Sequence, residues 1–161
     1  MASGNILVAF FSRTGNTRVI ADFIHEELGC DAFEIKPADP YPKDYDATVD
    51  RARREQDGDY RPGLATELEN TDSYDTVFVG YPNWWGTMPM AVFTFLEDHD
   101  LSGKTVVPFC THEGSRLGRS VKDIAGLYPR STMLDAIAVR GSAVQNARDD
   151  VSEWLQRIGM T

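Results

Sequence analysis

Five short apolar runs, separated by longer and more polar segments, dominate the pattern of this chain. Near-continuous apolarity is typical of strands in a parallel sheet that is covered on both faces. The runs predict strands over Ile6–Phe11, Ala32–Ile35, Thr76–Val79, Thr105–Phe109 and Thr132–Val139. Their starts lie about 25 to 45 residues apart, which leaves room for the helix that a parallel crossover requires.

The segments between the runs carry apolar residues at helical spacing. They predict a helix with Val19 to Leu28 on one side, a weaker one from Tyr45 to about Gln56, and others that begin at Pro89, span Gly118 to Leu127, and carry an apolar stripe from Val144 to Ile158. A strand followed by a helix, five times over, is typical of one doubly wound α/β domain, here residues 1–161. Ligands of such folds bind beyond the carboxyl ends of the strands, so the loops after the first, third and fourth runs are the candidate site.

The loop after the first run joins a strand directly to a helix and is rich in hydrogen-bond donors. It consists of Ser12, Arg13, Thr14, Gly15, Asn16 and Thr17. The free N–H groups at a helix start attract a phosphate, three hydroxyls can donate to its oxygens, and glycine lets the backbone approach closely. Because Arg13 is the one positive charge in the loop, we expect neutral dipoles to hold most of a bound phosphate.

Two other phosphate-binding motifs do not fit this loop. It lacks the Gly-Lys-Ser/Thr tripeptide of nucleotide-hydrolysing proteins and the G-x-G-x-x-G pattern of dinucleotide-binding ones. A monophosphate is the ligand that remains. The alternative at this point is that the six residues only cap the helix, since threonine and asparagine are favoured there.

The loop after the third run contains two adjacent tryptophans. The string is Pro82, Asn83, Trp84, Trp85 and Gly86. Two neighbouring indoles in a loop cannot both point into a covered core, so we expect at least one to lie against a planar ligand. Stacking of aromatic rings adds ~0.5–1.5 kcal/mol beyond area burial. The competing interpretation is that both indoles pack against neighbouring helices.

The loop after the fourth run, Cys110 to Ser120, is longer than the about 2–6 residues typical of such connections. It offers backbone amides, hydroxyls and two arginines, which can hold the polar edge of a heterocycle. The candidate binding residues in it are Thr111, His112, Glu113, Gly114, Ser115 and Gly118.

With these three loops the chain resembles the flavodoxins, the FMN-binding electron carriers, over nearly its whole length. Ser12 to Thr17 is similar to the family's FMN-phosphate loop, Pro82 to Gly86 to its first isoalloxazine loop, and Thr111 to Gly118 to its second. The strings Tyr81–Gly86 and Gly118–Ile124 resemble most a subgroup of short bacterial members. The resemblance implies FMN as cofactor, the strand order 2-1-3-4-5 in a five-stranded sheet, and no catalytic side chain.

Two features depart from the flavodoxin pattern. Glu113 stands where relatives often carry a small residue, and the Pro82-x-x-x-Gly86-x-Met88 spacing is also similar to small NAD(P)H:quinone reductases of the same fold. Two functions therefore stay open. One is an electron carrier between redox partners; the other is an FMN-dependent NAD(P)H oxidoreductase for quinones or nitro compounds. Retention of all three loops argues against a regulatory module without redox use.

Charge narrows the class of partner. The net charge of −9 argues against nucleic acid and against an anionic membrane surface. Ten acidic residues against five basic ones lie between Lys43 and Asp75, and Glu97, Asp98 and Asp100 follow. These acids predict either a solvated surface or a docking face for basic redox partner proteins, a reductase and an acceptor.

The cysteines and histidines predict neither a metal site nor export. Cys30 and Cys110 lack metal-ligand spacing and suit a reducing cytoplasm, and the three histidines are scattered. The first apolar run is too short to be a membrane span and has no basic region before it. We expect a cytoplasmic protein that is a monomer or a weak dimer.

Overall fold

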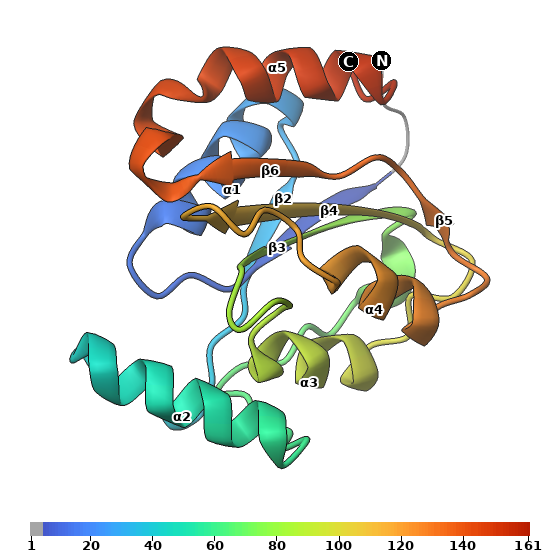
Figure 1. The fold of residues 1–161 in the computed structure, drawn as a ribbon. Helices are drawn as coiled ribbons and strands as arrows, with labels where there is room; N and C mark the ends of the chain where they lie inside the picture. The colour runs from blue at the N-terminus through green and yellow to red at the C-terminus, as the bar shows by residue number, and fades with distance from the viewer. Residues whose placement is uncertain (1–4) are drawn as a thin grey trace.

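Six strand segments form one parallel sheet in the computed structural model, which describes residues 5–161 (Figure 1). They are β1 (Ile6–Phe10), β2 (Asp31–Glu34), β3 (Thr76–Pro82), β4 (Thr105–His112), β5 (Thr132–Met133) and β6 (Ile137–Arg140). The order across the sheet is β2-β1-β3-β4-β5, and β6 also pairs with β4. The predicted α/β fold and strand order are therefore confirmed. Residues 1–4 of the expected domain lie outside the described part.

Helices cover both faces of the sheet. On one face lie α1 (Asn16–Leu28) and α5 (Arg148–Arg157), and on the other α3 (Met90–Asp98) and α4 (Ser120–Leu127). The remaining helix, α2 (Tyr45–Asp57), packs beside α3 and farther from the strands (Figure 1). Short 3₁₀ turns run over Thr71–Ser73 and Gly141–Asn146. Each α-helix overlaps a predicted one.

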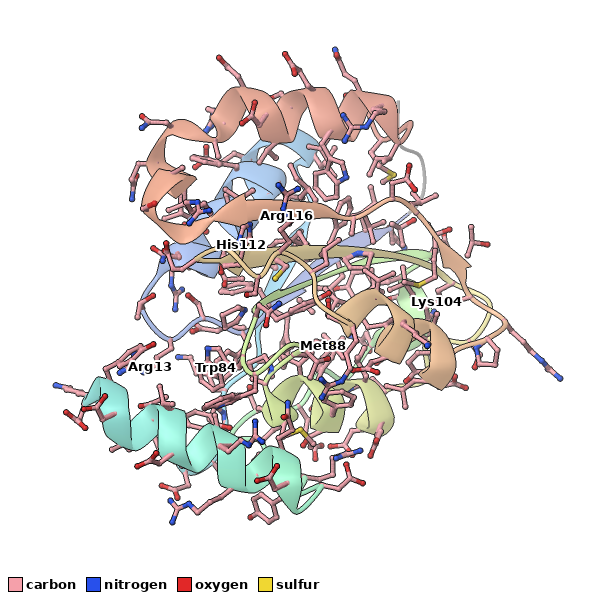
Figure 2. All side chains as sticks on the ribbon, viewed as in Figure 1. Arg13, Trp84, Met88, Lys104, His112 and Arg116 are labelled. Carbon is pink, nitrogen blue, oxygen red and sulfur yellow. The ribbon has the colours of Figure 1, made fainter. Side chains whose placement is uncertain are left out.

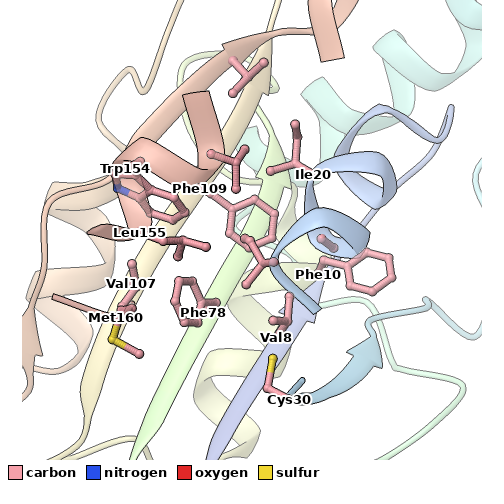
Figure 3. Packing of buried hydrophobic residues seen from close by; sticks show 14 of the residues in the cluster. Val8, Phe10, Ile20, Cys30, Phe78, Val107, Phe109, Trp154, Leu155 and Met160 are labelled. Atoms are coloured by element: carbon pink, nitrogen blue, oxygen red, sulfur yellow. The ribbon is translucent and has the colours of Figure 1, made fainter. Parts of the chain in front are cut away.

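Each face of the sheet has its own hydrophobic cluster, because successive side chains of a strand point to opposite faces. Under α1 and α5, Phe78 and Trp154 are fully buried and meet edge to face, with ring centroids 5.8 Å apart (Figure 3). Under α3 and α4, Val77 and Phe95 are equally buried. Burial on both faces explains why the central strands β1, β3 and β4 are continuous apolar runs, whereas the edge strand β2 is partly exposed.

The predicted strand Thr132–Val139 is not continuous. The register pairs are Thr105 with Thr132 in β5 and Phe109 with Ile137 in β6, which leaves one extra residue between the two segments. The carbonyl oxygens of Lys104 and Val106 accept hydrogen bonds from this strand. Because alternate residues of a strand face the same neighbour, the backbone of Pro108 faces it as well. Proline has no N–H to donate, and the ladder is interrupted opposite it.

The predicted stripe Val144–Ile158 also spans two elements instead of one helix. Its first part belongs to the 3₁₀ turn, where the N–H of Ala147 donates to the carbonyl of Val144 at 3.1 Å. The α-helix begins only at Arg148, and acidic residues in its first turn suit the positive end of the helix dipole. Val144, Ala147 and Val151 are nevertheless all buried, because the turn keeps its apolar side on the sheet.

Candidate functional site

A cleft of about 630 Å³ opens at the carboxyl ends of β1, β3 and β4, within the usual volume range of small-molecule sites. Residues of all three predicted loops line it: Ser12, Arg13, Thr14, Asn16, Thr17, Pro82, Asn83, Trp84, Trp85, Thr111, His112, Glu113, Gly114 and Ser115. The other predicted residues, Gly15, Gly86 and Gly118, lie outside the lining. Three loops that are far apart in the sequence thus form one site.

The first loop folds around the hydroxyl of Ser12. This oxygen accepts hydrogen bonds from the backbone N–H of Gly15 at 3.1 Å and of Arg18 at 3.3 Å. By contrast, the N–H groups of Thr14, Asn16 and Thr17 have no hydrogen-bond acceptor within residues 5–161. These groups lie at the start of α1, where the helix dipole is positive. They are available to an anion in the cleft.

Arg13 crosses from this loop to the start of α2. Its Nη2 donates to the carbonyl oxygen of Lys43 at 2.8 Å and contacts that of Pro42 at 3.4 Å. Its Nε is buried and has no hydrogen-bond partner among the described residues. A buried charged donor without an acceptor is rare in folded proteins. Together with the free N–H groups, it makes this end of the cleft fit a phosphate.

Trp84 forms an inner aromatic wall of the cleft. Its ring lies edge to face with Phe11 and with Tyr41, at centroid distances of 5.2 Å and 5.0 Å. The Tyr41 hydroxyl donates to the buried carboxylate of Glu55, and burial raises the pKa of Tyr41 above its ordinary value. Tyr41 therefore stays protonated and anchored, and it supports Trp84 from behind.

Trp85 is held against α2 by an unusual backbone conformation. It has a φ of 54°, in the left-handed region, and hydrogen bonds between Trp84 and Thr87 close the tight turn around it. Its indole Nε1 donates to the carbonyl of Val49 at 3.2 Å, and the guanidinium of Arg53 lies 4.8 Å from its ring centroid. Trp85 is 44% exposed. The two indoles therefore do not both point into the core, in agreement with the prediction from the sequence.

Asn83, Gly86 and Gly118 join the third-strand loop to the fourth-strand loop. The Asn83 side chain accepts from the N–H of Gly86 at 3.0 Å and donates to the carbonyl of Arg116 at 2.8 Å. The carbonyl of Gly86 accepts from the N–H of Arg119 at 2.8 Å. A Cβ atom on Gly118 would lie 2.2 Å from that carbonyl oxygen, so no larger residue fits. The backbone groups of Gly86 thus serve contacts within the protein.

Thr111 and His112 reach the cleft from the end of β4. The Thr111 hydroxyl forms a hydrogen bond with that of Thr17 at 2.8 Å. This bond connects the loop after β1 to the end of β4. His112 Nδ1 accepts from the N–H of Gly114 at 2.8 Å, so the neutral ring carries its proton on Nε2. Burial and the positive charges of Arg140 and Arg116 lower the pKa of His112 below its ordinary value. The ring is therefore a neutral donor at pH 7.

One wall of the cleft was missed by the sequence analysis. It is formed by α2, whose residues Tyr45, Thr48, Val49 and Ala52 line the cleft, with Gly141 contributing from the end of β6. The four α2 positions follow the i, i+3, i+4, i+7 spacing of one helix face. That spacing is visible in the sequence, but it does not show which surface the face meets. Figure 2 shows Arg13 and Trp84 beside this helix.

No group of three or more His, Cys, Asp or Glu side chains within residues 5–161 is placed to hold a metal ion. Burial raises the pKa of the Cys30 thiol to about 11 and that of Cys110 to about 12, so both thiols stay protonated at neutral pH. No helix in this part of the chain is long and apolar enough to cross a bilayer.

Comparisons with known proteins agree with the geometry. A family model described as flavodoxin matches residues 5–158. A candidate flavoprotein from Bacteroides eggerthii is 34% identical, with 99% of this chain and 100% of that chain covered and a TM-score of 0.85. Another from Bacteroides uniformis is 31% identical, with coverages of 96% and 99% and a TM-score of 0.85.

A more distant solved structure contains a ligand. It is a flavoprotein from Lactobacillus acidophilus in complex with FMN, 21% identical, with 89% of this chain and 98% of that chain covered and a TM-score of 0.73. At this identity the likeness concerns the fold. A search among curated proteins finds no match.

Proposed function

This chain belongs to the flavodoxin family, and from that membership we propose that it is an FMN-binding electron-transfer protein. The geometry of the loop Ser12–Thr17 after β1 is the observation that supports this proposal most directly. Residues with free N–H groups and hydroxyls line the cleft together with Arg13, whose Nε has no partner among the described residues, and with Trp84 and Trp85. A phosphate joined to a planar ring system matches this arrangement of donors and aromatic surface.

The proposal assigns each loop a part of the cofactor. Ser12 to Thr17 would hold the phosphate, Trp84 and Trp85 the ring faces, and Thr111 to Ser115 the polar edge of the ring. FMN, when bound, supplies redox chemistry that no side chain provides. The residues of the chain bind and orient it and exclude water. None is needed as an acid or a base, and the proton on His112 Nε2 serves as a hydrogen-bond donor.

An FMN-dependent NAD(P)H oxidoreductase acting on quinones or nitro compounds is the alternative. Tyr45 and Trp85 both line the cleft, and their side chains are 70% and 44% exposed. Exposed aromatic surface at the cleft offers a planar second substrate a place to stack.

Direct use of NAD(P)H separates the two functions. We expect the FMN-loaded protein to oxidise NADPH or NADH only slowly with a quinone or nitro acceptor present, and to accept electrons rapidly once a flavoprotein reductase is added. Absorbance at the nicotinamide band, with and without the reductase, measures both rates. Rapid NAD(P)H oxidation by the protein alone would favour the oxidoreductase.

Exchange of the tryptophans for leucine tests the proposed ring contact. We expect bound FMN to be strongly quenched in the native protein, and Trp84→Leu or Trp85→Leu to restore part of its fluorescence. Loss of one stacking contact, worth ~0.5–1.5 kcal/mol, should weaken FMN binding about 2- to 13-fold. Trp154→Phe, in the core on the α1 and α5 side, is the control and should leave the quenching unchanged. Unaltered quenching in both leucine variants would refute the contact.

We further propose a basic protein as the redox partner. The exposed carboxylates of Asp46 and Asp50 lie on α2, the helix that lines the cleft. Charge complementarity raises encounter rates ~10- to 1000-fold at low salt, and the Debye length shrinks from ~30 Å at 0.01 M to ~8 Å at 0.15 M.

Electron transfer with a basic reductase should therefore slow as salt rises. Stopped-flow measurement of the second-order rate against ionic strength checks this. The variant Asp46→Lys/Asp50→Lys should lower the rate at low salt, whereas Asp149→Lys/Asp150→Lys on α5 should leave it nearly unchanged. An electron-transfer rate that does not depend on salt would mean that the acidic residues of α2 are solvated surface and do not dock a partner.

We propose a cytoplasmic location and a monomer or weak dimer for the same protein. Both cysteines are free thiols, which supports a reducing compartment.

A further inference from the structure

Helix α2 is held to the rest of the protein by polar contacts and not by the hydrophobic core. None of its residues belongs to either hydrophobic cluster of residues 5–161, and the residues that it buries are Thr48, Ala52 and Glu55. A segment with few buried apolar contacts opens at a small cost in free energy. The position of α2 therefore depends on its polar links.

The chain that leads into α2 is tied to the helix. The guanidinium of Arg51 donates to the carbonyl oxygens of Asp39 and Pro40 at 2.8 Å and 2.9 Å. The Thr48 hydroxyl donates to the carbonyl oxygen of Pro42 at 2.7 Å. Because these bonds run from the helix back to the chain before it, the two parts behave as one body.

Arg13 joins this body to the first loop. Its backbone lies between Ser12 and Thr14, and its Nη2 donates at 2.8 Å to the carbonyl oxygen of Lys43, one residue before Asp44, the N-cap of α2. Its buried Nε has no hydrogen-bond partner among the described residues. An anion bound by the same loop would attract this guanidinium and stabilise the conformation in which Arg13 reaches α2.

Trp85 joins the same helix to the loop after β3. Its indole Nε1 donates to the carbonyl oxygen of Val49 at 3.2 Å, and its own carbonyl oxygen accepts from Gln56 Nε2 at 3.2 Å. The guanidinium of Arg53 lies 4.8 Å from the ring centroid. The φ of 54° at Trp85 is costly for a bulky residue and persists only while the surroundings enforce it. The position of Trp85 therefore depends on where α2 lies.

We propose that α2 is a clamp that couples the two ends of the cofactor site. A phosphate at the first loop fixes α2 through Arg13, and α2 in turn fixes Trp85 beside the ring. Arg13, Gln56 and Trp85 are the positioning residues of this clamp. The inference rests on the proposed FMN site and goes beyond it, because the phosphate and the ring then bind cooperatively although they contact different loops. A flavin without a phosphate leaves α2 and Trp85 less firmly held.

Paired titrations with FMN and riboflavin test the coupling. The readout is the phosphate preference, defined as the Kd of riboflavin divided by the Kd of FMN. Trp85→Phe keeps an aromatic ring but removes the bond to Val49, and Gln56→Ala removes the bond to the carbonyl of Trp85. Neither residue belongs to the first loop, yet we expect each variant to lower the phosphate preference about 5-fold, the lower end of typical couplings between sites. Gln156→Ala, an exposed glutamine on α5, is the matched control and should leave it unchanged.

A second background separates coupling from a local structural effect of Trp85. Arg13→Ala lowers the phosphate preference by itself, because it removes a positive charge from the loop. In that background Trp85→Phe should cause no further change, since the link from the phosphate to α2 is already cut. In the Arg18→Ala background its effect should stay about 5-fold, because the Arg18 guanidinium pairs with Glu34 and not with the α2 segment.

Hydrogen exchange of the α2 amides gives a readout at saturating ligand. We expect FMN to slow exchange in Tyr45–Asp57 about 5-fold more than riboflavin does, and Arg13→Ala to abolish this difference.

Three results would overturn the inference and leave the proposed function standing. They are an unchanged phosphate preference in both Trp85→Phe and Gln56→Ala, an equal effect of Trp85→Phe with and without Arg13, and equal protection of α2 by the two flavins. If the native protein instead binds FMN and riboflavin equally well, the phosphate site itself is wrong, and the proposed function fails together with the clamp.

Discussion

Replacing both Thr14 and Thr17 with alanine is expected to weaken FMN binding about 100-fold or more while riboflavin binding changes much less. In the proposed site each hydroxyl would donate to the charged phosphate, and such a hydrogen bond contributes roughly 1.5–3 kcal/mol. Tenfold in affinity corresponds to about 1.4 kcal/mol. Fluorescence titration of the protein without cofactor, with FMN and with riboflavin, measures the effect.

Two further variants separate phosphate binding from loop structure. Serine at both positions keeps the hydroxyls and should retain most of the affinity for FMN. Thr111→Ala breaks the hydrogen bond to Thr17 but leaves the first loop's hydroxyls in place. It should therefore weaken FMN and riboflavin alike. If the native protein binds the two flavins equally well, the first loop does not hold a phosphate.

The variant Gly80→Ala should lower the free energy of unfolding by about 2–3 kcal/mol, because there is no room for a methyl group on β3. The added Cβ atom would lie 2.1 Å from Cζ of Phe109, a completely buried residue of β4 in the cluster under α1 and α5. Overpacking of a core typically costs about 1–3 kcal/mol. For a chain of this size, the loss corresponds to a drop in Tm of roughly 4–12 °C.

Denaturant unfolding with two companion variants checks this explanation. Phe109→Leu shortens the opposing side chain, so Gly80→Ala should cost clearly less in that background than in the native one. Gly126→Ala in α4 is the control, because a Cβ atom there meets nothing within 4 Å. In a helix this change should stabilise the protein by about 0.5–1 kcal/mol. An equal cost of Gly80→Ala in both backgrounds would rule out the clash as the cause.

The fold was predictable because its signals are local. Each buried strand is a run of apolar residues, and each helix except the last has its apolar positions within its own span. The two errors also have local causes. Pro108 in β4 could have predicted the break in the fifth strand, since proline in a central strand leaves a ladder position without a donor. Asp149 and Asp150 could have predicted a helix that starts at Arg148.

The candidate site was predictable in its loops but not in the way that they are joined. The sequence predicted Gly86 and Gly118 as residues of the binding loops. In the structure they let two backbones approach each other, with Arg119 donating to the carbonyl of Gly86. The choice between these roles depends on where a loop more than thirty residues away comes to lie. No local pattern contains that information.

The sequence by itself determined the order of strands and helices along the chain. It also determined that the loop after β1 is rich in hydrogen-bond donors and that two tryptophans lie at the ligand end of the sheet. These follow from side-chain spacing within each segment. Only the tertiary structure decided that α2 forms a wall of the cleft and that Trp85 lies on it through Val49. It also decided that Arg13 Nε is buried without a hydrogen-bond partner among residues 5–161, and that Arg140 of β6 pairs with His112 of β4. Each of these features is a contact between segments distant in the chain, and its geometry exists only once the strands that carry those segments have paired.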